Sequence, residues 1–285
     1  MEKTAFRLIA FDLDGTLLDD EKRIPGECLR ALRAAGEAGL LLVPATGRIP
    51  AGLPDELLAL PGLRYGLLVN GALLYDFEAQ RVLGAEEIPL ETALEVVDFL
   101  AALPVLYDCY QGGWGYMDRA LYDAAADYIE DRGILELLWR VRTPVPSLRR
   151  YLAEQGRGVE KLQLHTKDRA LRRRLLEELP ARFPSLAVTT SIPTNIELNA
   201  ARANKGDALL HLCALLGLDP AAVLAFGDGT NDLSLLRAAG CGVAMANAAP
   251  EVLAAAKLVA PSNNEAGMAQ VLRRILSDDE RSDVR

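Results

Sequence analysis

Two aspartates, Asp12 and Asp14, are the residues of this chain whose types and spacing most clearly suggest chemistry. They follow the apolar residues 8–11, which are typical of a buried parallel strand, and they precede Gly15 and Thr16. Because open α/β sheets bind ligands beyond the carboxyl ends of their strands, we expect both carboxylates at such an end. Buried carboxylates are costly unless a cation or hydrogen bonds hold them. Phosphoryl chemistry assisted by Mg²⁺ would explain this pair.

The segment 227–232 (GDGTND) supplies further acidic groups, and it follows residues 223–226, which are typical of another buried strand. Lys205 stands just ahead of a predicted helix, and Thr46 follows a predicted strand. A carboxylate can attack an anionic phosphate ester only if the repulsion between them is cancelled. Mg²⁺, a lysine ammonium, a threonine hydroxyl and backbone N–H groups can all contribute to this. One aspartate could then attack phosphorus while its neighbour transfers protons.

Each of these segments also has a purely structural explanation. Asp-Gly is a common turn dipeptide, and residues 46–48 could form an ordinary turn between a strand and a helix. Arg48 could contact substrate or be a solvated side chain. Residues 228–232 could form a calcium-binding turn, although the remaining alternation of an EF-hand loop is missing. Lys205 is poorly placed at a helix start unless an anion or a carboxylate lies nearby, which favours a functional role.

The elements that would position these residues alternate between strand and helix at both ends of the chain. The expected strands are residues 8–11, 40–43, 66–69, 223–226, 242–245 and 257–260. One expected helix begins at Pro25, and three more cover residues 54–60, 205–216 and 233–239. This rhythm predicts an α/β fold with a doubly wound parallel sheet, similar to the Rossmann fold.

The middle of the chain has a different pattern, which indicates an inserted α+β domain. The expected elements are a helix at 90–102, a hairpin at 107–117 that turns at Gly112 and Gly113, strands at 160–164 and 187–190, and a helix at 170–179. We therefore predict a catalytic core of residues 1–80 and 191–285, with residues 81–190 inserted as a cap. Three aromatic residues near the turn either pack across the sheet or form part of a substrate lid: Tyr110, Trp114 and Tyr116.

Composition restricts the partners and the compartment. The 285 residues carry a formal net charge of −9, which disfavours nucleic acid as a partner because its phosphate backbone needs a basic surface. The four cysteines are widely separated and form no CxxC motif, so we expect free thiols in a reducing compartment. Residues 1–11 lack the pattern of a secretory leader, and no apolar run approaches the ~20 residues of a membrane span. We expect a cytoplasmic protein without a membrane partner, and the sequence carries no signal for an oligomeric state.

Taken together, four segments resemble the motifs of the haloacid dehalogenase-like (HAD) hydrolases. In order, they are residues 12–17 (DLDGTL), 45–48 (ATGR), 204–206 (NKG) and 227–232 (GDGTND). Residues 242–248 (GVAMANA) resemble the stretch that follows in the Cof-type branch of this superfamily. In that branch a class IIB cap is also inserted between the second and third motifs.

The resemblance implies that Asp12 is the nucleophile that forms an aspartyl phosphate, and that Asp14 is the general acid and then the base. Thr46 and Lys205 would hold the phosphoryl group as part of the catalytic set. The residues implied for substrate and phosphate binding are Thr46, Gly47, Arg48, Lys205 and Asn231. The implied Mg²⁺ ligands are Asp12, Asp14 through its backbone carbonyl, and Asp228, with Asn231 and Asp232 completing or orienting the metal shell. This interpretation requires Asp12 and Asp228 to converge beside Lys205.

These observations predict a Mg²⁺-dependent phosphatase that acts on small phosphorylated metabolites, with sugar phosphates favoured by the resemblance. One alternative is a phosphomutase that uses the same aspartyl phosphate and releases an isomerised sugar phosphate. Another is a phospho-accepting signalling or binding protein. Such receivers are about one small domain long and lack an acid that speeds hydrolysis, so Asp14 and the insert argue against it. The cap would exclude water during phosphoryl transfer.

Overall fold

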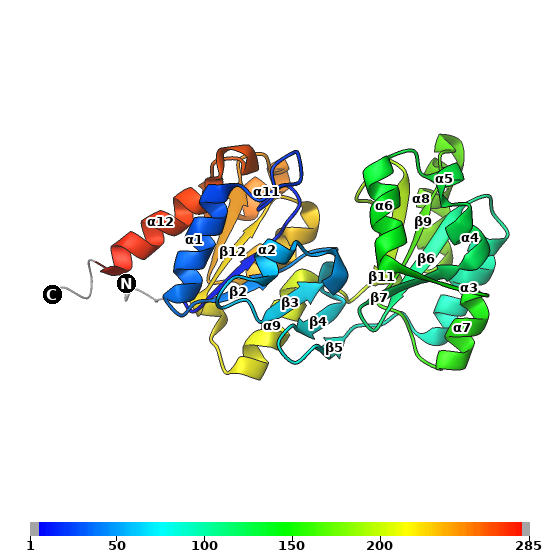
Figure 1. Cartoon of the computed structure of the whole chain (residues 1–285), viewed down its shortest axis with the longest axis horizontal. Helices are drawn as coiled ribbons and strands as arrows, with labels where there is room; N and C mark the ends of the chain where they lie inside the picture. The colour runs from blue at the N-terminus through cyan, green and yellow to red at the C-terminus, as the bar shows by residue number, and fades with distance from the viewer. Residues whose placement is uncertain (1–5, 281–285) are drawn as a thin grey trace. The chain divides into compact units, whose positions relative to one another are not determined.

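The computed structural model in Figure 1 describes residues 6–280 and divides into two compact units. The first unit contains the described residues up to Arg48, Leu53–Leu83, and the described residues from Asn204 onward. The second unit consists of Ile49–Gly52 and Gly84–Ala203. The chain thus builds the first unit from both of its ends, and the second unit from its middle.

A five-stranded parallel sheet forms the centre of the first unit, in the order β14-β13-β12-β1-β2. Its strands are β1 (Leu8–Phe11), β2 (Leu41–Pro44), β12 (Val223–Gly227), β13 (Cys241–Met245) and β14 (Leu258–Ala260). All four side chains of β1 are buried, as expected for an apolar strand covered on both faces. The predicted α/β fold with a doubly wound parallel sheet is therefore confirmed.

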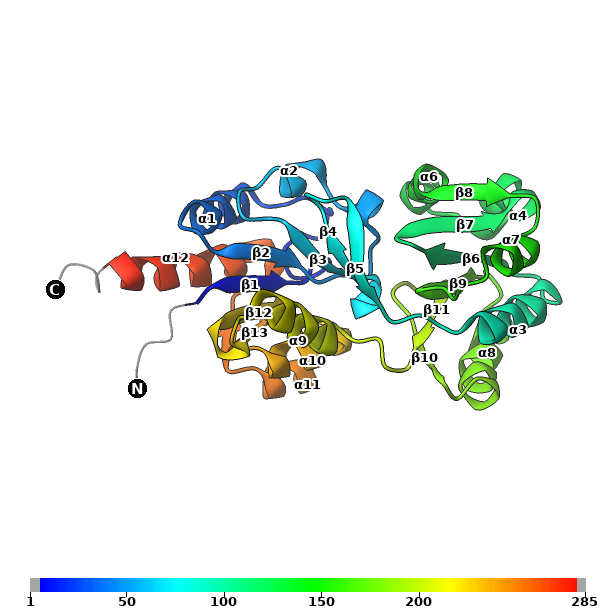
Figure 2. The same cartoon turned by 90° about the horizontal axis from the view of Figure 1, so that it is seen from below.

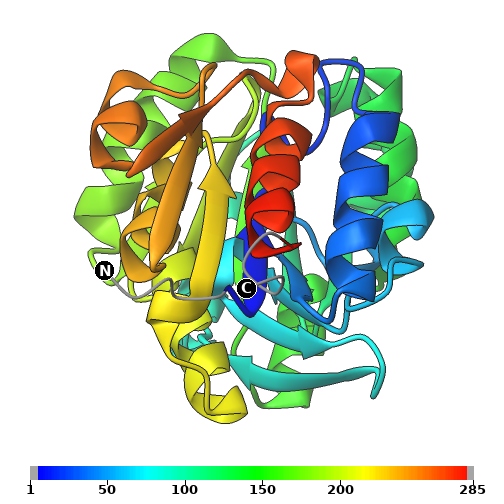
Figure 3. The same ribbon diagram turned by 90° about the vertical axis from the view of Figure 1, so that its left-hand side faces the viewer.

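Helices cover both faces of this sheet (Figures 2 and 3). On one face lie α1 (Gly26–Glu37) and α12 (Gly267–Glu280), which pack against each other. On the other face lie α9 (Lys205–Leu216), α10 (Leu233–Ala238) and α11 (Pro250–Ala255). The short α2 (Asp55–Leu58) follows β2. No helix among the described residues is long and apolar enough to span a membrane.

The strand predicted at 66–69 is present as β3 (Tyr65–Leu68), but its ladder differs from the expected one. β3 pairs antiparallel with β4 (Leu73–Asp76), in a small sheet that ends with β5 (Arg81–Ala85). Only isolated parallel bridges link its region to β2, one of them between Ala45 and Leu67. The chain reverses after β3 because Val69 and Asn70 adopt left-handed φ angles of 53° and 59°.

The second unit is an α+β domain, as predicted for the insert, with a six-stranded sheet in the order β10-β11-β9-β6-β7-β8. Its strands are β6 (Leu106–Gln111), β7 (Trp114–Asp118), β8 (Arg142–Val145), β9 (Lys161–His165), β10 (Leu186–Thr189) and β11 (Asn195–Ala200). Its helices are α3 (Leu90–Ala101), α4 (Arg119–Asp123), α5 (Ala125–Tyr128), α6 (Arg132–Val141), α7 (Leu148–Gln155) and α8 (Arg169–Arg182). Apolar side chains of the sheet, such as Leu162 and Leu164, join a core that includes residues of α3, α7 and α8.

The predicted division of the chain differs from these units at its second boundary. The sequence pattern predicts that the core resumes at residue 191, whereas the second unit continues to Ala203. The difference arises from β11, which pairs with both β9 and β10. β11 alternates apolar and polar residues that are all buried, and Glu197 forms an ion pair with Lys161 Nζ at 2.7 Å. Such buried charge makes a strand difficult to recognise from its sequence.

The aromatic residues of the predicted hairpin have different surroundings. The turn between β6 and β7 uses Gly112 and Gly113, both with left-handed φ angles, as predicted. Tyr110 is buried and its hydroxyl accepts a hydrogen bond from Arg142, while Trp114 is exposed. Tyr116 stacks on Tyr151. Tyr110 and Tyr116 thus make packing contacts within the second unit.

The four cysteines, Cys28, Cys109, Cys213 and Cys241, are free thiols, as the sequence predicted. The first three are buried and Cys241 is partly exposed. They lie on different elements of the two units.

Candidate active site

Three neighbouring parallel strands bring the sequence-predicted residues to one edge of the sheet. β1 lies between β12 and β2, and Phe11 is aligned with both Phe226 and Pro44. Asp12 directly follows β1, and Asp228 directly follows β12. Thr46 comes two residues after β2, and it is buried. The nucleophile candidate therefore lies between the second acidic loop and the threonine loop.

The carboxylates of Asp12, Asp228 and Asp232 form a compact cluster, in which one oxygen from each lies within 4.8 Å of the others. Asp12 is 7% exposed and Asp232 is fully buried. Burial raises the pKa of Asp12 to about 7 and that of Asp228 to about 6, with Lys205 opposing both shifts. When ionised, these three carboxylates face the single ammonium of Lys205, which leaves the cluster with a net negative charge. Three hard oxygen donors with this charge imbalance fit a divalent cation such as Mg²⁺.

Lys205 is fully buried and contacts two members of the cluster. Its Nζ atom donates to Asp12 Oδ1 at 2.7 Å and to Asp232 Oδ1 at 2.6 Å. Burial by itself would lower the pKa of Lys205, but these two carboxylates raise it, so the side chain is an ammonium. The carboxylates also offset the unfavourable position of a cation at the first residue of α9. Lys205 therefore has the carboxylate partner that its position at a helix start predicts.

Asp232 also organises the loop that follows β12. Its Oδ2 atom accepts hydrogen bonds from the backbone N–H groups of Asp228 at 3.0 Å and Gly229 at 2.9 Å. The neighbouring Asn231 donates through Nδ2 to Asn70 Oδ1 at 3.3 Å. Asp232 therefore fixes the backbone that carries Asp228, and Asn231 joins this loop to the reversal after β3.

Gly15 and Thr16, which are not among the predicted site residues, support the cluster from the loop after β1. Thr16 Oγ1 donates to Asp228 Oδ1 at 2.7 Å. Gly15 has a φ of +87°, and a Cβ atom on it would lie only 2.3 Å from Asp228 Oδ2. A glycine directly after the acidic pair is the feature of the sequence that indicates a backbone closely approached by another group. Asn247 Nδ2 donates to the Gly15 carbonyl at 2.8 Å.

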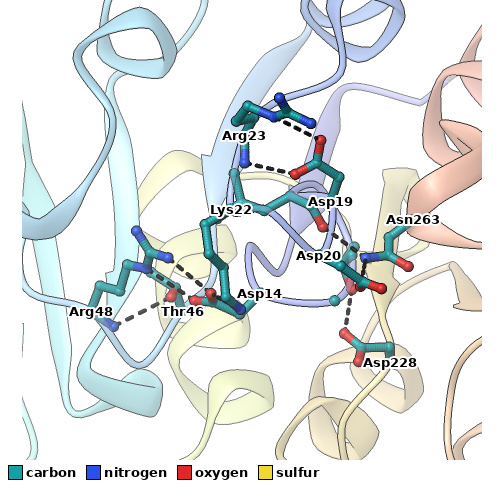
Figure 4. Close-up of polar contacts among 12 residues, drawn as sticks. Asp14, Asp19, Asp20, Lys22, Arg23, Thr46, Arg48, Asp228 and Asn263 are labelled. Atoms are coloured by element: carbon teal, nitrogen blue, oxygen red, sulfur yellow. Dashed lines mark hydrogen bonds and ion pairs between the residues drawn. The ribbon is translucent and has the colours of Figure 1, made fainter. Parts of the chain in front are cut away.

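Asp14 lies outside the buried cluster and contacts two cations (Figure 4). Arg48 donates from Nε to Oδ2 at 3.0 Å and from Nη2 to Oδ1 at 2.9 Å. Lys22 Nζ donates to Oδ1 at 2.8 Å. Burial would raise the pKa of Asp14, but Arg48 and then Lys22 outweigh it and lower the pKa below its usual value. The structure therefore gives Arg48 an acidic partner, and it adds Lys22, which is not among the predicted site residues.

The loop after β2 is held beside the same site. Thr46 Oγ1 accepts a hydrogen bond from the Arg48 backbone N–H at 3.3 Å. The Asn70 backbone N–H donates to the Thr46 carbonyl at 3.0 Å. A Cβ atom on Gly47 would lie 3.1 Å from Asn70 Oδ1, so this glycine lets the amide pack closely. Asn70 thus contacts both the Thr46 loop and, through Asn231, the loop after β12.

A model of the haloacid dehalogenase-like hydrolases matches residues 9–272 of the chain. The chain belongs to this HAD family. It is 30% identical over 272 residues to 5-amino-6-(5-phospho-D-ribitylamino)uracil phosphatase YcsE of Bacillus subtilis, covering 95% of this chain and 96% of the relative. It is also 30% identical over 276 residues to pyridoxal phosphate phosphatase YbhA of Escherichia coli, covering 93% and 97%.

Solved structures agree with this assignment. The crystal structure of a haloacid dehalogenase-like hydrolase from Bacteroides thetaiotaomicron matches with a TM-score of 0.81 and 27% identity, covering 95% of this chain and 99% of that chain. The predicted resemblance to the HAD superfamily is therefore confirmed, and this chain is an enzyme of the HAD phosphatase type.

Proposed function

We propose that this HAD enzyme is a Mg²⁺-dependent phosphatase that hydrolyses phosphomonoesters of small metabolites through an aspartyl phosphate on Asp12. The observation that carries the proposal is the position of Asp12, which is almost fully buried between the Lys205 ammonium and the carboxylates of Asp228 and Asp232. A carboxylate in this setting is oriented by an ammonium at 2.7 Å, next to donors that suit a divalent cation.

The side chains of Asp12 and Asp228 and the backbone carbonyl of Asp14 would hold Mg²⁺, with Asn231 and Asp232 supporting the loop. When bound, the ion supplies positive charge that reduces the repulsion between a carboxylate and a phosphate ester. Asp232 contributes through its hydrogen bonds to the loop backbone and to Lys205. The phosphoryl oxygens would be bound by residues of three loops: Thr46, Gly47, Arg48, Lys205 and Asn231.

In the first step, an Asp12 carboxylate oxygen bonds to phosphorus, the ester P–O bond breaks, and Asp14 gives its proton to the leaving oxygen. In the second step, Asp14 takes a proton from water, the water oxygen bonds to phosphorus, and the bond to Asp12 breaks to release phosphate. Arg48 and Lys22 favour the ionised form of Asp14, which the second step requires. Asp14 must, however, carry a proton in the first step. Contact with the leaving group must therefore displace Arg48 or Lys22 from Asp14 before that step.

We place sugar phosphates first among the candidate substrates. The YcsE and YbhA relatives carry the names of phosphatases for two different small phosphomonoesters, which supports a small phosphorylated metabolite. The second unit, residues 81–190 in our prediction and up to Ala203 in the structure, is proposed as the domain that selects among them.

The test is phosphate release from a panel of sugar phosphates by wild type and Asp12→Asn, with Mg²⁺ and with a chelator. We expect wild type to release phosphate only with Mg²⁺, and Asp12→Asn to keep its fold by circular dichroism while losing turnover. Release at the wild-type rate by Asp12→Asn would exclude this mechanism. Accumulation of an isomerised sugar phosphate without free phosphate would instead identify a phosphomutase.

A further inference from the structure

Lys22 occupies a tight turn whose backbone is unfavourable for a residue with a side chain. Its φ angle is +62°, in the left-handed region that non-glycine residues rarely adopt. The Lys22 N–H donates to the Asp19 carbonyl, and the Asp19 N–H donates to the Arg23 carbonyl, each at 2.9 Å. The Arg23 N–H also donates to Asp19 Oδ1 at 2.9 Å. These contacts direct the Lys22 side chain toward Asp14 (Figure 4).

The turn is anchored to the first unit by two asparagines. Asn263 is buried, and its Nδ2 atom donates to the Leu18 carbonyl at 2.9 Å and to Asp20 Oδ1 at 3.3 Å. Asn264 exchanges two hydrogen bonds with Asp20, one to its carboxylate and one from its backbone N–H. The backbone around Lys22 is thus fixed from the C-terminal part of the chain (Figure 4).

Asp14 does not depend on Lys22 for its orientation. Arg48 contacts both carboxylate oxygens of Asp14 by itself, which is the geometry that best orients a carboxylate. The Lys22 side chain is 61% exposed, compared with 25% for Arg48. An exposed lysine paired with an already oriented carboxylate contributes little to stability. The strained backbone that holds Lys22 beside Asp14 therefore needs another explanation.

We propose that Lys22 is a specificity-determining residue whose ammonium binds a hydroxyl group on the leaving group, at the carbon next to the one that bears the ester oxygen. The inference rests on the proposed function, in which Asp14 exchanges a proton with that ester oxygen. The ester oxygen would accept a hydrogen bond from protonated Asp14 Oδ1, and Lys22 Nζ donates to the same Oδ1 atom, so the two groups lie no farther apart than two hydrogen bonds, roughly 6 Å. A hydroxyl on the adjacent carbon falls within this span, and the flexible lysine stem can reach it.

The preferred substrates are then phosphomonoesters of polyols and sugars with a hydroxyl vicinal to the ester. The test uses propane-1,2-diol 1-phosphate, propane-1,3-diol 1-phosphate and propyl phosphate, which differ only in the presence and position of one hydroxyl. Lys22→Gly removes the ammonium, and glycine adopts the φ of this turn without strain, so the fold is retained. The value of kcat/KM is measured for each ester with Mg²⁺.

For Lys22→Gly we expect kcat/KM on the 1,2-diol ester to fall about ten- to a hundredfold further than on the other two esters, as for the loss of a charged hydrogen bond, while the lost contact with Asp14 lowers all three values equally. Lys22→Arg should restore most of the preference. Gln80→Gly is the matched control, because Gln80 is exposed and has a φ of +52° in a different turn. It should leave all three values unchanged.

Equal losses of kcat/KM on all three esters in Lys22→Gly would overturn the inference, because Lys22 would then act only through Asp14. Unchanged values on all three esters would overturn it as well. The proposed function is tested separately by turnover of propyl phosphate by wild type, which needs no contact with Lys22. If wild type with Mg²⁺ released no phosphate from any of these esters or from p-nitrophenyl phosphate, the proposed function itself would be rejected.

Discussion

Gly15 illustrates how a residue without a side chain determines the geometry of the acidic cluster. The loop after β1 passes so close to Asp228 that even a methyl group would meet the carboxylate, and the same loop supplies Thr16 as a hydrogen-bond donor to it. The separation between the two acidic loops is therefore set by backbone contact as well as by charge.

At this scale we predict that Gly15→Ala weakens Mg²⁺ activation at least tenfold, because the new Cβ atom displaces Asp228. Gly39→Ala is the matched control, since Gly39 has a similar φ of +91° but no atom within 4 Å of the added Cβ. Both variants should lose about 1 kcal/mol of unfolding free energy through backbone strain. Mg²⁺ titrations of phosphate release check the difference, and equal activation constants for the two variants would contradict the explanation.

Among the elements, the β6–β7 hairpin depends on a buried carboxylate. Glu160 accepts hydrogen bonds from the N–H groups of Gly112 at 2.8 Å and Gly113 at 3.5 Å, and it contacts Arg157. Burial raises the pKa of Glu160 from 4.5 to about 7, although these hydrogen bonds oppose the shift. The hairpin is thus tied to the residue that precedes β9.

We predict a pH dependence of stability from this carboxyl. Between pH 4.5 and 7 the folded chain binds the Glu160 proton more tightly than the unfolded chain does, so the free energy of unfolding decreases as the pH rises through this window. Glu160→Gln removes this contribution. The stability difference between wild type and variant should change by about 3 kcal/mol between pH 4.5 and 7.5, as measured by urea denaturation. Parallel pH profiles would show that Glu160 does not titrate in this range.

Much of the arrangement of elements could be predicted from the sequence, because the strands of the first unit are short apolar runs and its loops carry distinctive residues. The convergence of Asp12, Asp228 and Lys205 followed from placing each at a predicted element end. β11 was not predicted, since its buried Glu197 is stabilised by a lysine from another strand, which only the fold reveals. The left-handed φ of Lys22 has no local sequence signal, so its contact with Asp14 was not predicted either.

For the whole molecule, the two units have separate hydrophobic cores. One core includes Leu8, Leu209 and Val223 of the first unit, and the other includes Val97 and Leu162 of the second. All of the proposed Mg²⁺ ligands belong to the first unit. Mg²⁺ binding should therefore stabilise the first unit directly.

We predict that differential scanning calorimetry will show this asymmetry. Mg²⁺ at a hundred times its dissociation constant should stabilise the first unit by about 2.7 kcal/mol. The unfolding midpoint of the second unit should be the same with Mg²⁺ as with a chelator. Asp228→Asn should abolish the shift while leaving the second transition unchanged. A Mg²⁺-dependent shift that persists in this variant would contradict the proposed ligand set.

The free cysteines bear on how this enzyme withstands oxidants. Burial raises the thiol pKa of all four, Cys28, Cys109, Cys213 and Cys241, so little of the thiolate that reacts with peroxide or alkylating agents is present at neutral pH. None of the four belongs to the proposed site, where the attacking atom is a carboxylate oxygen. Phosphate release should therefore persist at concentrations of peroxide or iodoacetamide that inactivate phosphatases with a cysteine nucleophile.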